Sequence, residues 1–247
     1  MALLHSFEKE GNWLFKHRGQ LPIVLFILAI PAVCFTSYDL MGTGTVKFIN
    51  YTAYFLSILG FIVRAYTIGT TPRGTSGRNT AEQVAEQLNK SGIYSMVRHP
   101  LYLGNYLMWI GIVLFTKNIE FTIIVSLMYW LYYERIMFAE ERFLERKFGQ
   151  SYLDWAAGVP AFIPRFSLFT KSSISFSLKS VLRREYSGVL ATVVGFVFVD
   201  FLIGYKQWNE FAVGRNFLYL LLITLVITVI LRSLKHYSSV LKEEGRS

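Results

Sequence analysis

The chain has 247 residues, of which 53% are hydrophobic and 17% aromatic, and it carries a formal net charge of +9. Apolar residues gathered in long runs exclude an ordinary water-soluble domain and indicate a membrane protein. The single cysteine, Cys34, excludes an internal disulfide. We expect it to be a packed thiol, because it lies inside an apolar run.

Six apolar runs are candidates for membrane-spanning helices, since a span needs about 20 mostly apolar residues. They cover roughly residues 21–41, 47–68, 101–116, 119–138, 187–205 and 214–234. The short segment TKNIE joins the third and fourth runs, which predicts a helical hairpin. The predicted fold class is therefore all-α, a polytopic membrane helical bundle of about six transmembrane helices. The hairpin is the expected core of this bundle, and an interfacial amphipathic segment follows.

Basic residues follow the predicted topology. If the six runs cross the membrane in turn, the termini and the two long loops lie on one side and the short links lie on the other. Only four of the 25 lysines and arginines fall on the side of the short links: Lys47, Lys117, Lys206 and Arg215. Because cytoplasmic segments are enriched in Lys and Arg, we expect both termini and both long loops in the cytoplasm, together with any site that these loops form. The expected location is a bacterial inner membrane. Charges that follow topology argue against a nucleic-acid partner, so the expected partner is a membrane lipid or a lipidated substrate.

Composition divides the chain into three parts. Residues 1–165 form the predicted membrane core, residues 166–186 a Ser-rich basic linker on the membrane, and residues 187–247 a terminal helix pair with a cytoplasmic tail. Within the core, loop 69–91 begins Gly/Thr-rich and then predicts a short polar helix around Ala81–Leu88. A solvated connector and a lid over a polar ligand both explain this loop. The aromatic, proline-containing segment QSYLDWAAGVPAFIPRF is typical of chain that lies in the interface.

The stretch GIYSMVRHPLYLGNYL, residues 92–107, places charge at the edge of the third run. Pro100 suits the first turn of a helix, whose free N–H groups and positive dipole end attract anions. Arg98 adds a fork of donors for a carboxylate or phosphate, and His99 adds a group that titrates near neutrality. The stretch predicts an anion-binding cup with a proton acceptor. Alternatively, Arg98 binds no ligand and lies at the membrane interface, where its charge fixes the topology of the chain.

An aromatic face continues below this cup. By their spacing, one side of the third helix carries Tyr102, then Asn105 or Tyr106, and then Trp109. An aromatic belt at the interface explains the rings, whereas the Asn105 amide needs a partner at that depth.

The end of the fourth helix carries acidic residues. Glu140 shares a face with Tyr129 and Tyr133, and acidic groups near the end of an apolar helix are functional candidates. Alternatively, Glu140 has no functional role and forms a salt bridge to a nearby arginine such as Arg135. The following charged residues, Glu141 to Lys147, predict a solvated amphipathic helix with i, i+4 pairs.

The motifs SGIYSMVRHPLYLGNYL and EERFLERKFGQSYLDWAAGVPAFIP, separated by one hairpin, resemble the isoprenylcysteine carboxyl methyltransferase and phospholipid methyltransferase family. The resemblance covers about residues 50–165. It implies an integral membrane enzyme that uses S-adenosylmethionine. The cofactor contacts that it implies fall on Tyr94, His99, Pro100, Leu101, Tyr102 and Glu140. Segment Glu86–Asn89 occupies the place of a short cofactor-contacting loop.

One position departs from the pattern of the prenylcysteine enzymes. They have an arginine for the substrate carboxylate where this chain has Ile136, and the adjacent Arg135 is turned about 100° around the helix. Arg98, Arg135, Arg73 or Arg78 therefore remain as candidates to hold a different acceptor. Asn105 is a further candidate contact.

These observations predict a membrane methyltransferase acting on a membrane amphiphile. The arginines favour an acidic oxygen as acceptor, phosphate before carboxylate, and a lipid A 1-phosphate fits. The predicted catalytic residues are Arg98, which holds an anion, and His99, which acts as base if the acceptor is an amine. Four histidines far apart in sequence predict no metal site. Isoprenylcysteine carboxyl methylation, phospholipid N-methylation, a sterol-type NADPH reductase and a transporter remain alternatives. The sequence leaves the oligomeric state open.

Overall fold

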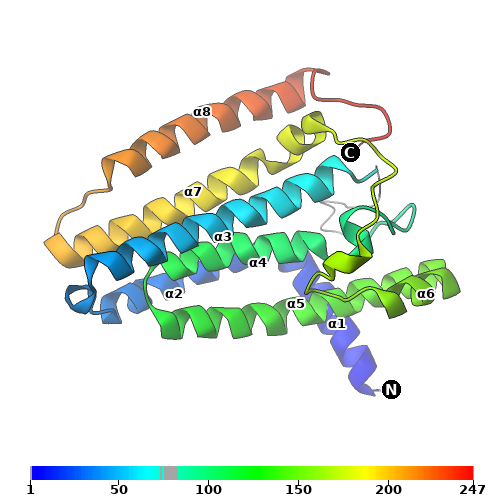
Figure 1. Ribbon diagram of the computed structural model, residues 1–247, viewed down its shortest axis with the longest axis horizontal. Helices are drawn as coiled ribbons and strands as arrows, with labels where there is room; N and C mark the ends of the chain where they lie inside the picture. The colour runs from blue at the N-terminus through cyan, green and yellow to red at the C-terminus, as the bar shows by residue number, and fades with distance from the viewer. Residues whose placement is uncertain (1, 73, 75–82, 247) are drawn as a thin grey trace.

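The computed structural model describes residues 2–72, 74 and 83–246, and every regular element in that part of the chain is helical. Six helices run side by side along the long axis (Figure 1). They are α2 (Leu21–Phe35), α3 (Thr43–Gly69), α4 (Pro100–Phe115), α5 (Ile119–Phe148), α7 (Leu178–Trp208) and α8 (Arg215–Tyr237). The remaining elements are α1 (Ala2–His17), α6 (Gln150–Gly158) and the 3₁₀ turns η1 (Tyr38–Leu40), η2 (Ile93–Ser95) and η3 (Phe166–Leu168). The predicted all-α bundle with an α4–α5 hairpin is confirmed.

Three helices among the described residues, α3, α7 and α8, are long and apolar enough to cross a membrane. The apolar stretches Ile23–Phe35 of α2 and Pro100–Phe115 of α4 are shorter. Helix α5 has 30 residues, but its second half begins with Glu134 and Arg135 and carries further charged residues, which lower its hydropathy. All six predicted helices are therefore present, whereas the predicted count of about six membrane spans is not confirmed.

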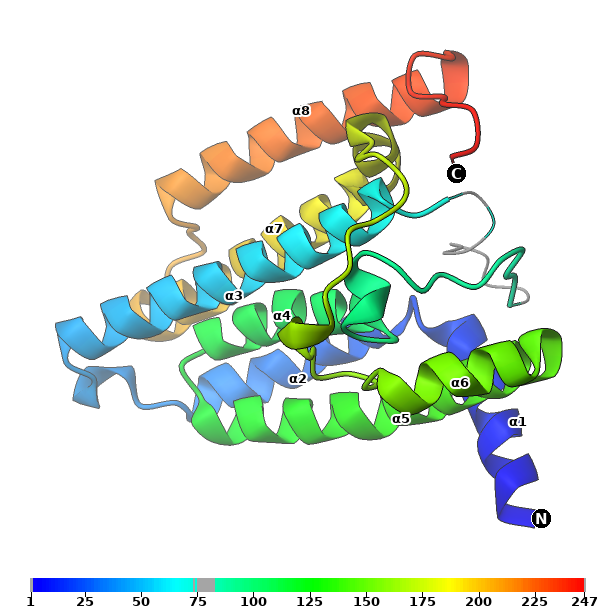
Figure 2. The same ribbon diagram turned by 45° about the vertical axis from the view of Figure 1, so that its right-hand side comes forward.

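The two ends of the bundle differ in the length of their connections. Both termini, α6, η3 and the long connection that leads into α4 gather at one end (Figures 1 and 2). The short links from α2 to α3, from α4 to α5 and from α7 to α8 lie at the other end. This arrangement matches the prediction that both termini and both long loops share one side.

Helices α3 and α4 approach each other along a seam of small residues. A Cβ added to Gly60 would lie 2.5 Å from the backbone oxygen of Gly104. Ser57 on α3 donates a hydrogen bond to the backbone oxygen of Met108 at 2.9 Å, within the same seam. Small side chains allow such close backbone approach inside a membrane. The seam fixes the position of Arg64, one turn after Gly60, against α4.

Several predicted helix boundaries differ from the structure, and one predicted helix is not formed. Helix α2 ends at Phe35 rather than near residue 41, and α5 continues to Phe148 rather than ending near residue 138. Helix α7 begins at Leu178, well before residue 187, because the Ser177 hydroxyl accepts from the Ser180 backbone N–H and caps the helix there. The helix predicted around Ala81–Leu88 is wrong for residues 83–88, which form no helix, and residues 81–82 lie outside the described part. A helix this short is unstable unless it is packed. The Glu86 N–H instead donates to the backbone oxygen of Gly74 at 2.9 Å.

Helix α1 has no counterpart among the predicted apolar runs. It packs on α5 near the end that holds both termini. The Phe7 ring meets Phe138 edge-on, with ring centroids 6.0 Å apart, and the Arg135 guanidinium lies 3.5 Å above the centroid of Phe7. Helix α1 therefore covers the second half of α5.

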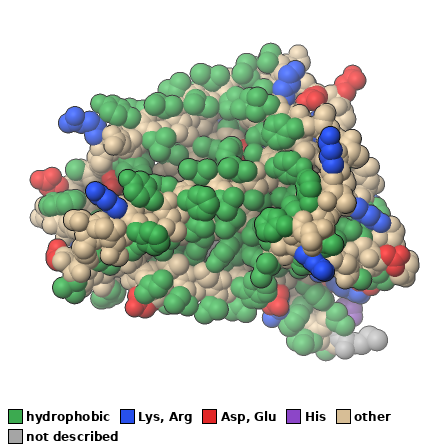
Figure 3. Space-filling view, in the orientation of Figure 1, with side chains coloured by type: hydrophobic (Ala, Val, Ile, Leu, Met, Phe, Trp, Pro, Cys, Tyr) green, Lys and Arg blue, Asp and Glu red, His purple; other side chains and the backbone are tan. Residues whose placement is uncertain are grey.

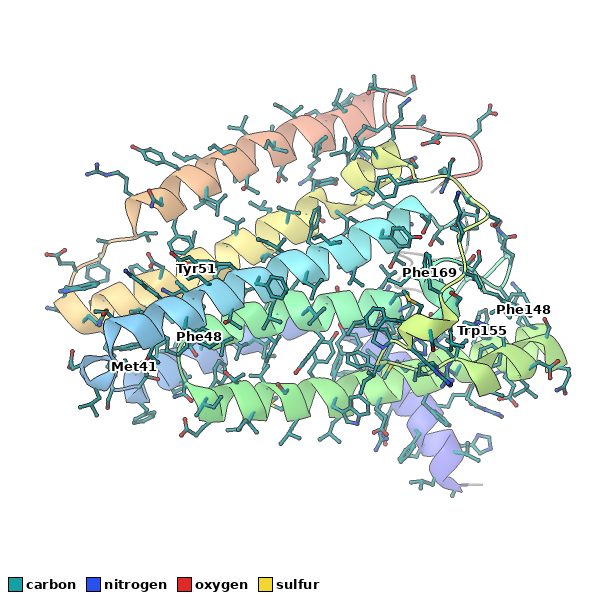
Figure 4. The ribbon with its side chains drawn as sticks, viewed as in Figure 1. Met41, Phe48, Tyr51, Phe148, Trp155 and Phe169 are labelled. Atoms are coloured by element: carbon teal, nitrogen blue, oxygen red, sulfur yellow. The ribbon has the colours of Figure 1, made fainter. Side chains whose placement is uncertain are left out.

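Apolar side chains cover much of the outer surface, as Figure 3 shows for one face. Phe48 and Tyr51 of α3 lie on this outer side in Figure 4, and both are largely exposed. Such a surface suits contact with lipid. Cys34 is also exposed, so the prediction of a packed thiol is wrong. In a membrane protein both the packed interior and the lipid-facing surface are apolar. The position of Cys34 in an apolar run therefore does not show in which of the two it lies.

Candidate active site

A polar cavity of about 190 Å³ lies at the end of the bundle that holds both termini. It gathers side chains from α3, α4, α5, α7 and the 83–99 connection. Seven of the predicted site residues in the 94–105 stretch line it, together with Glu140: Tyr94, Arg98, His99, Pro100, Leu101, Tyr102 and Asn105. The fold therefore brings together the residues that the family resemblance and the local sequence pattern pointed to.

Chain beyond α6 holds the start of α4 in position. The Arg98 N–H donates to the backbone oxygen of Pro160 at 2.9 Å, and the His99 N–H to that of Ala161 at 3.1 Å. Pro100 then opens α4, where its missing N–H costs nothing. The segment that follows α6 is thus part of the site's framework.

The Arg98 guanidinium is bound within the protein. Its Nε donates to Glu141 Oε1 at 2.9 Å, and Nη2 lies 3.4 Å from Glu141 Oε2. Its Nη1 donates to the backbone oxygens of Ala156 and Val159, each at 2.7 Å. Four of the five N–H groups are engaged in this way. Arg98 therefore ties α6 to α5 and does not present an open fork to an anion.

His99 lies between two carboxylates. Its Nε2 is 2.8 Å from Glu141 Oε1, and its Nδ1 is 3.7 Å from Glu140 Oε2. Tyr102, stacked against the His99 ring, donates to Glu140 Oε2 at 2.8 Å. These contacts fix Glu140 at the cavity wall.

Glu141 is a residue that sequence reasoning assigned to a solvated helix face, and this assignment is wrong. Its side chain is only 25% exposed. Burial raises the pKa of its carboxyl, but the hydrogen bond from His99 and the charges of His99 and Arg98 outweigh burial, so the net pKa is lowered. Helix periodicity alone does not reveal that α6 folds back over this face of α5.

Tyr94 contributes an aromatic wall to the cavity, and burial raises the pKa of its phenol well above the ordinary value. The indole Nε1 of Trp155 on α6 donates to the Tyr94 backbone oxygen at 3.3 Å. Figure 4 shows Trp155 and Phe169 at the same end of the bundle. Aromatic side chains from two segments thus gather beside the cavity.

Arg64 and Glu185 are site residues that sequence reasoning missed. The Arg64 Nε and Nη2 donate to the two oxygens of Glu185, each at 2.6 Å, and Nη1 donates to Asn105 Oδ1 at 2.5 Å. The partner that Asn105 was expected to need is therefore Arg64. One signal was available, because Arg64 is an ionisable residue inside an apolar run.

The structure places other predicted residues elsewhere. Arg135 does not line the polar cavity but packs against α1, with its Nε 3.5 Å from Glu10 Oε2. Arg73 and Arg78 lie outside the described residues. Three residues of the Glu86–Asn89 segment, Gln87, Leu88 and Asn89, line the cavity, so this loop is more than a solvated connector.

The arrangement suits binding and alignment of a charged ligand. Four arginines and two glutamates line the cavity, and aromatic rings border it. Within the described part of the chain, no three His, Cys, Asp or Glu side chains gather as metal ligands do.

Comparison with known proteins gives a family for the region around this cavity. The family model described as phospholipid methyltransferase matches residues 48–151. A nickel-cobalt-cadmium resistance protein, NccN, of Alcaligenes xylosoxydans is 38% identical over 98 residues, which cover 40% of this chain and 43% of NccN. No solved structure matches the chain.

Two eukaryotic relatives carry an enzyme name. A protein-S-isoprenylcysteine O-methyltransferase of Schizosaccharomyces pombe is 30% identical over 120 residues, covering 46% of this chain and 51% of the relative. Protein-S-isoprenylcysteine O-methyltransferase B of Arabidopsis thaliana is 33% identical over 110 residues, covering 43% and 55%. The chain spans about half the length of these relatives. The residues that match the phospholipid methyltransferase family model, 48–151, include α4 and α5, which line the cavity.

Proposed function

We propose that this chain is an integral membrane methyltransferase that uses S-adenosylmethionine. One observation carries the proposal: a single cavity gathers Tyr94, the His99–Tyr102 turn and Glu140, the residues to which the family resemblance assigns the cofactor. The relatives named protein-S-isoprenylcysteine O-methyltransferase support the same class of reaction.

The residues present fit this cofactor. The Glu140 carboxylate, held by Tyr102, suits an ammonium group, and arginine side chains suit a carboxylate. The rings of Tyr94 and Tyr102 suit a flat heterocycle or a sulfonium cation. When bound, S-adenosylmethionine supplies an electrophilic methyl group. The role of the protein is then to align the acceptor and to exclude water.

The acceptor that we propose is an acidic oxygen. Both ring nitrogens of His99 lie toward carboxylates, so this imidazole is suited to position Glu140 rather than to deprotonate an amine. An acceptor that is already an oxyanion needs no base. The excess of arginines over glutamates around the cavity attracts such an anion.

The acceptor belongs to a membrane amphiphile in this proposal. An apolar cavity of about 200 Å³, lined by α2, α3, α4, α5 and α7, shares two lining residues with the polar one and offers space for an apolar chain. A lipid A type phosphate and an isoprenylcysteine-like carboxylate are two forms of this acceptor. The two relatives named protein-S-isoprenylcysteine O-methyltransferase support the carboxylate form. NccN is named for metal resistance, and none of the three relatives is named for a lipid phosphate.

We also propose that the polar cavity faces the cytoplasm of a bacterial cell. The basis is the distribution of lysine and arginine. The four basic residues assigned to the opposite side include Lys117, in the short link from α4 to α5, and Lys206, in the last turn of α7.

Equilibrium binding to the purified chain in detergent tests the proposal. Labelled S-adenosylmethionine should bind, and Glu140→Gln should weaken binding about tenfold or more, by loss of a charge-assisted contact. Glu134→Gln is the matched control, because Glu134 lies on the same helix but does not line the cavity. Binding of NADPH with hydride transfer would instead support a reductase. Binding of neither cofactor would contradict an enzyme of either kind and favour a transporter.

A further inference from the structure

Arg64 joins three helices inside the bundle. Its guanidinium reaches Asn105 of α4 at 2.5 Å and both oxygens of Glu185 of α7 at 2.6 Å. Glu185 is only 2% exposed, and the Arg64 side chain is 15% exposed. Gly104 leaves room for this side chain, because a Cβ there would lie 2.5 Å from Arg64 Cγ.

This arginine stands where two cavities meet. Arg64 and Asn105 are the two residues that line both the polar cavity and the apolar cavity. The polar cavity holds Glu140 and Tyr94, whereas the apolar cavity is lined by side chains such as Phe26, Met108 and Ile112. A molecule with an acidic head and an apolar chain would place its head at this junction.

Arg64 has donors left for such a head. A guanidinium carries five N–H groups. Three of those on Arg64 bind Glu185 and Asn105, and the other two, one on each Nη, make no hydrogen bond to the described residues. Two N–H groups on neighbouring nitrogens match the oxygens of a carboxylate or phosphate.

We propose that Arg64 and Asn105 bind the acidic head of the acceptor at this junction, with its apolar part in the apolar cavity, and that Glu185 limits the affinity of the site. The inference rests on the proposed function and assigns its acceptor site. Glu185 belongs to α7, outside the matched residues 48–151. The terminal helix pair thus supplies a residue that tunes acceptor binding.

The charges predict opposite effects for the two partners of the pair. Arg64→Gln removes the cation that attracts the head. Glu185→Gln keeps an oxygen to accept from Arg64 but leaves the guanidinium without its counter-ion, so that an anionic head becomes its remaining partner. A pair that only stabilises the fold would lose function in both variants.

The experiment compares two amphiphiles of equal chain length, dodecyl phosphate and uncharged dodecanol, on the purified full chain in a non-ionic detergent. Affinity is measured from the rise in Tm with concentration, which requires no methyl transfer. The wild type should prefer dodecyl phosphate about tenfold, Arg64→Gln should abolish the preference, and Glu185→Gln should raise it about tenfold. The matched controls are Arg146→Gln and Glu8→Gln, an interhelical pair at 2.6 Å outside both cavities, which should keep the wild-type preference.

Each outcome bears on the inference. Equal loss of preference in Arg64→Gln and Glu185→Gln, or a preference retained in Arg64→Gln, would overturn it. If a single variant does not fold, the double variant Arg64→Gln/Glu185→Gln, which removes both charges together, should fold and show no preference; a retained preference there would also overturn the inference. Binding of S-adenosylmethionine is measured on the same samples. If the wild type does not bind S-adenosylmethionine, that result counts against the proposed function. The preference for dodecyl phosphate still tests the Arg64 site in that case, because it is measured without the cofactor.

Discussion

Arg98 and Glu141 form an ion pair at 2.9 Å that joins the start of α4 to the second half of α5. The same Glu141 oxygen lies 2.8 Å from His99 Nε2. One carboxylate therefore orients both the arginine and the histidine of the RHPLY motif. The ion pair thereby fixes the start of α4, where His99 and Tyr102 contact Glu140.

This relationship predicts how acid destabilises the protein. Because the folded-state pKa of Glu141 is lowered, its contribution to stability is fully present above the unfolded carboxyl value of about 4.3 and is lost as pH falls through the folded-state pKa. Glu141→Gln should lower the free energy of unfolding by about 1–3 kcal/mol at pH 7 and much less at pH 3. Thermal unfolding of both proteins in detergent at the two pH values measures the difference. A cost that does not shrink on acidification would contradict the assignment.

The Tyr102 hydroxyl is predicted to act through Glu140. Tyr102→Phe removes a 2.8 Å hydrogen bond to that carboxylate but keeps the ring that packs against Tyr133. Affinity for S-adenosylmethionine should fall about threefold to tenfold with little change in Tm, as expected for one hydrogen bond to a charged group. The control is Tyr106→Phe on the same helix, whose hydroxyl donates to Ser126 at 3.0 Å outside both cavities. Equal losses of affinity in both variants would show that the Glu140 contact is not the cause.

The α3–α4 seam predicts a reversal of the usual glycine rule. Replacing a helical glycine with alanine ordinarily stabilises by about 0.5–1 kcal/mol. Gly104→Ala should instead destabilise by about 1–3 kcal/mol, because its Cβ would lie 2.5 Å from Arg64 Cγ and 2.9 Å from the Gly60 backbone oxygen. Gly44→Ala in α3 meets no atom within 4 Å and should follow the usual rule. Unfolding of the two variants measures both signs, and a stabilising Gly104→Ala would contradict the packing described here.

Much of this architecture could be predicted from the chain alone. The long apolar runs predicted every helix of the bundle, because a helix that must be apolar on all sides leaves a strong compositional signal. The turn at Pro100 and the face that carries Glu140 followed from local rules for helix starts and periodicity. These features depend on neighbours a few residues apart.

Other features depend on contacts between distant segments. Arg64 and Glu185 are 121 residues apart, and no local pattern links them. Glu141 has the spacing of a solvated helix face, but it is covered by segments distant in sequence, which include Arg98 and His99. Helix α1 was missed because its apolar residues, such as Phe7 and Phe15, recur on one side of the helix without forming a long run.

Transfer of label from methyl-labelled S-adenosylmethionine into the lipids of membranes that contain this chain tests the central claim most directly. We expect label in an acidic amphiphile, lost in Glu140→Gln and retained in Glu134→Gln. Stability of the product in mild base separates a phosphate methyl ester from a labile carboxyl ester. Label in an amine headgroup would contradict the proposed oxyanion acceptor. The absence of label from both lipid and protein, with no cofactor bound by the purified chain, would contradict the methyltransferase itself.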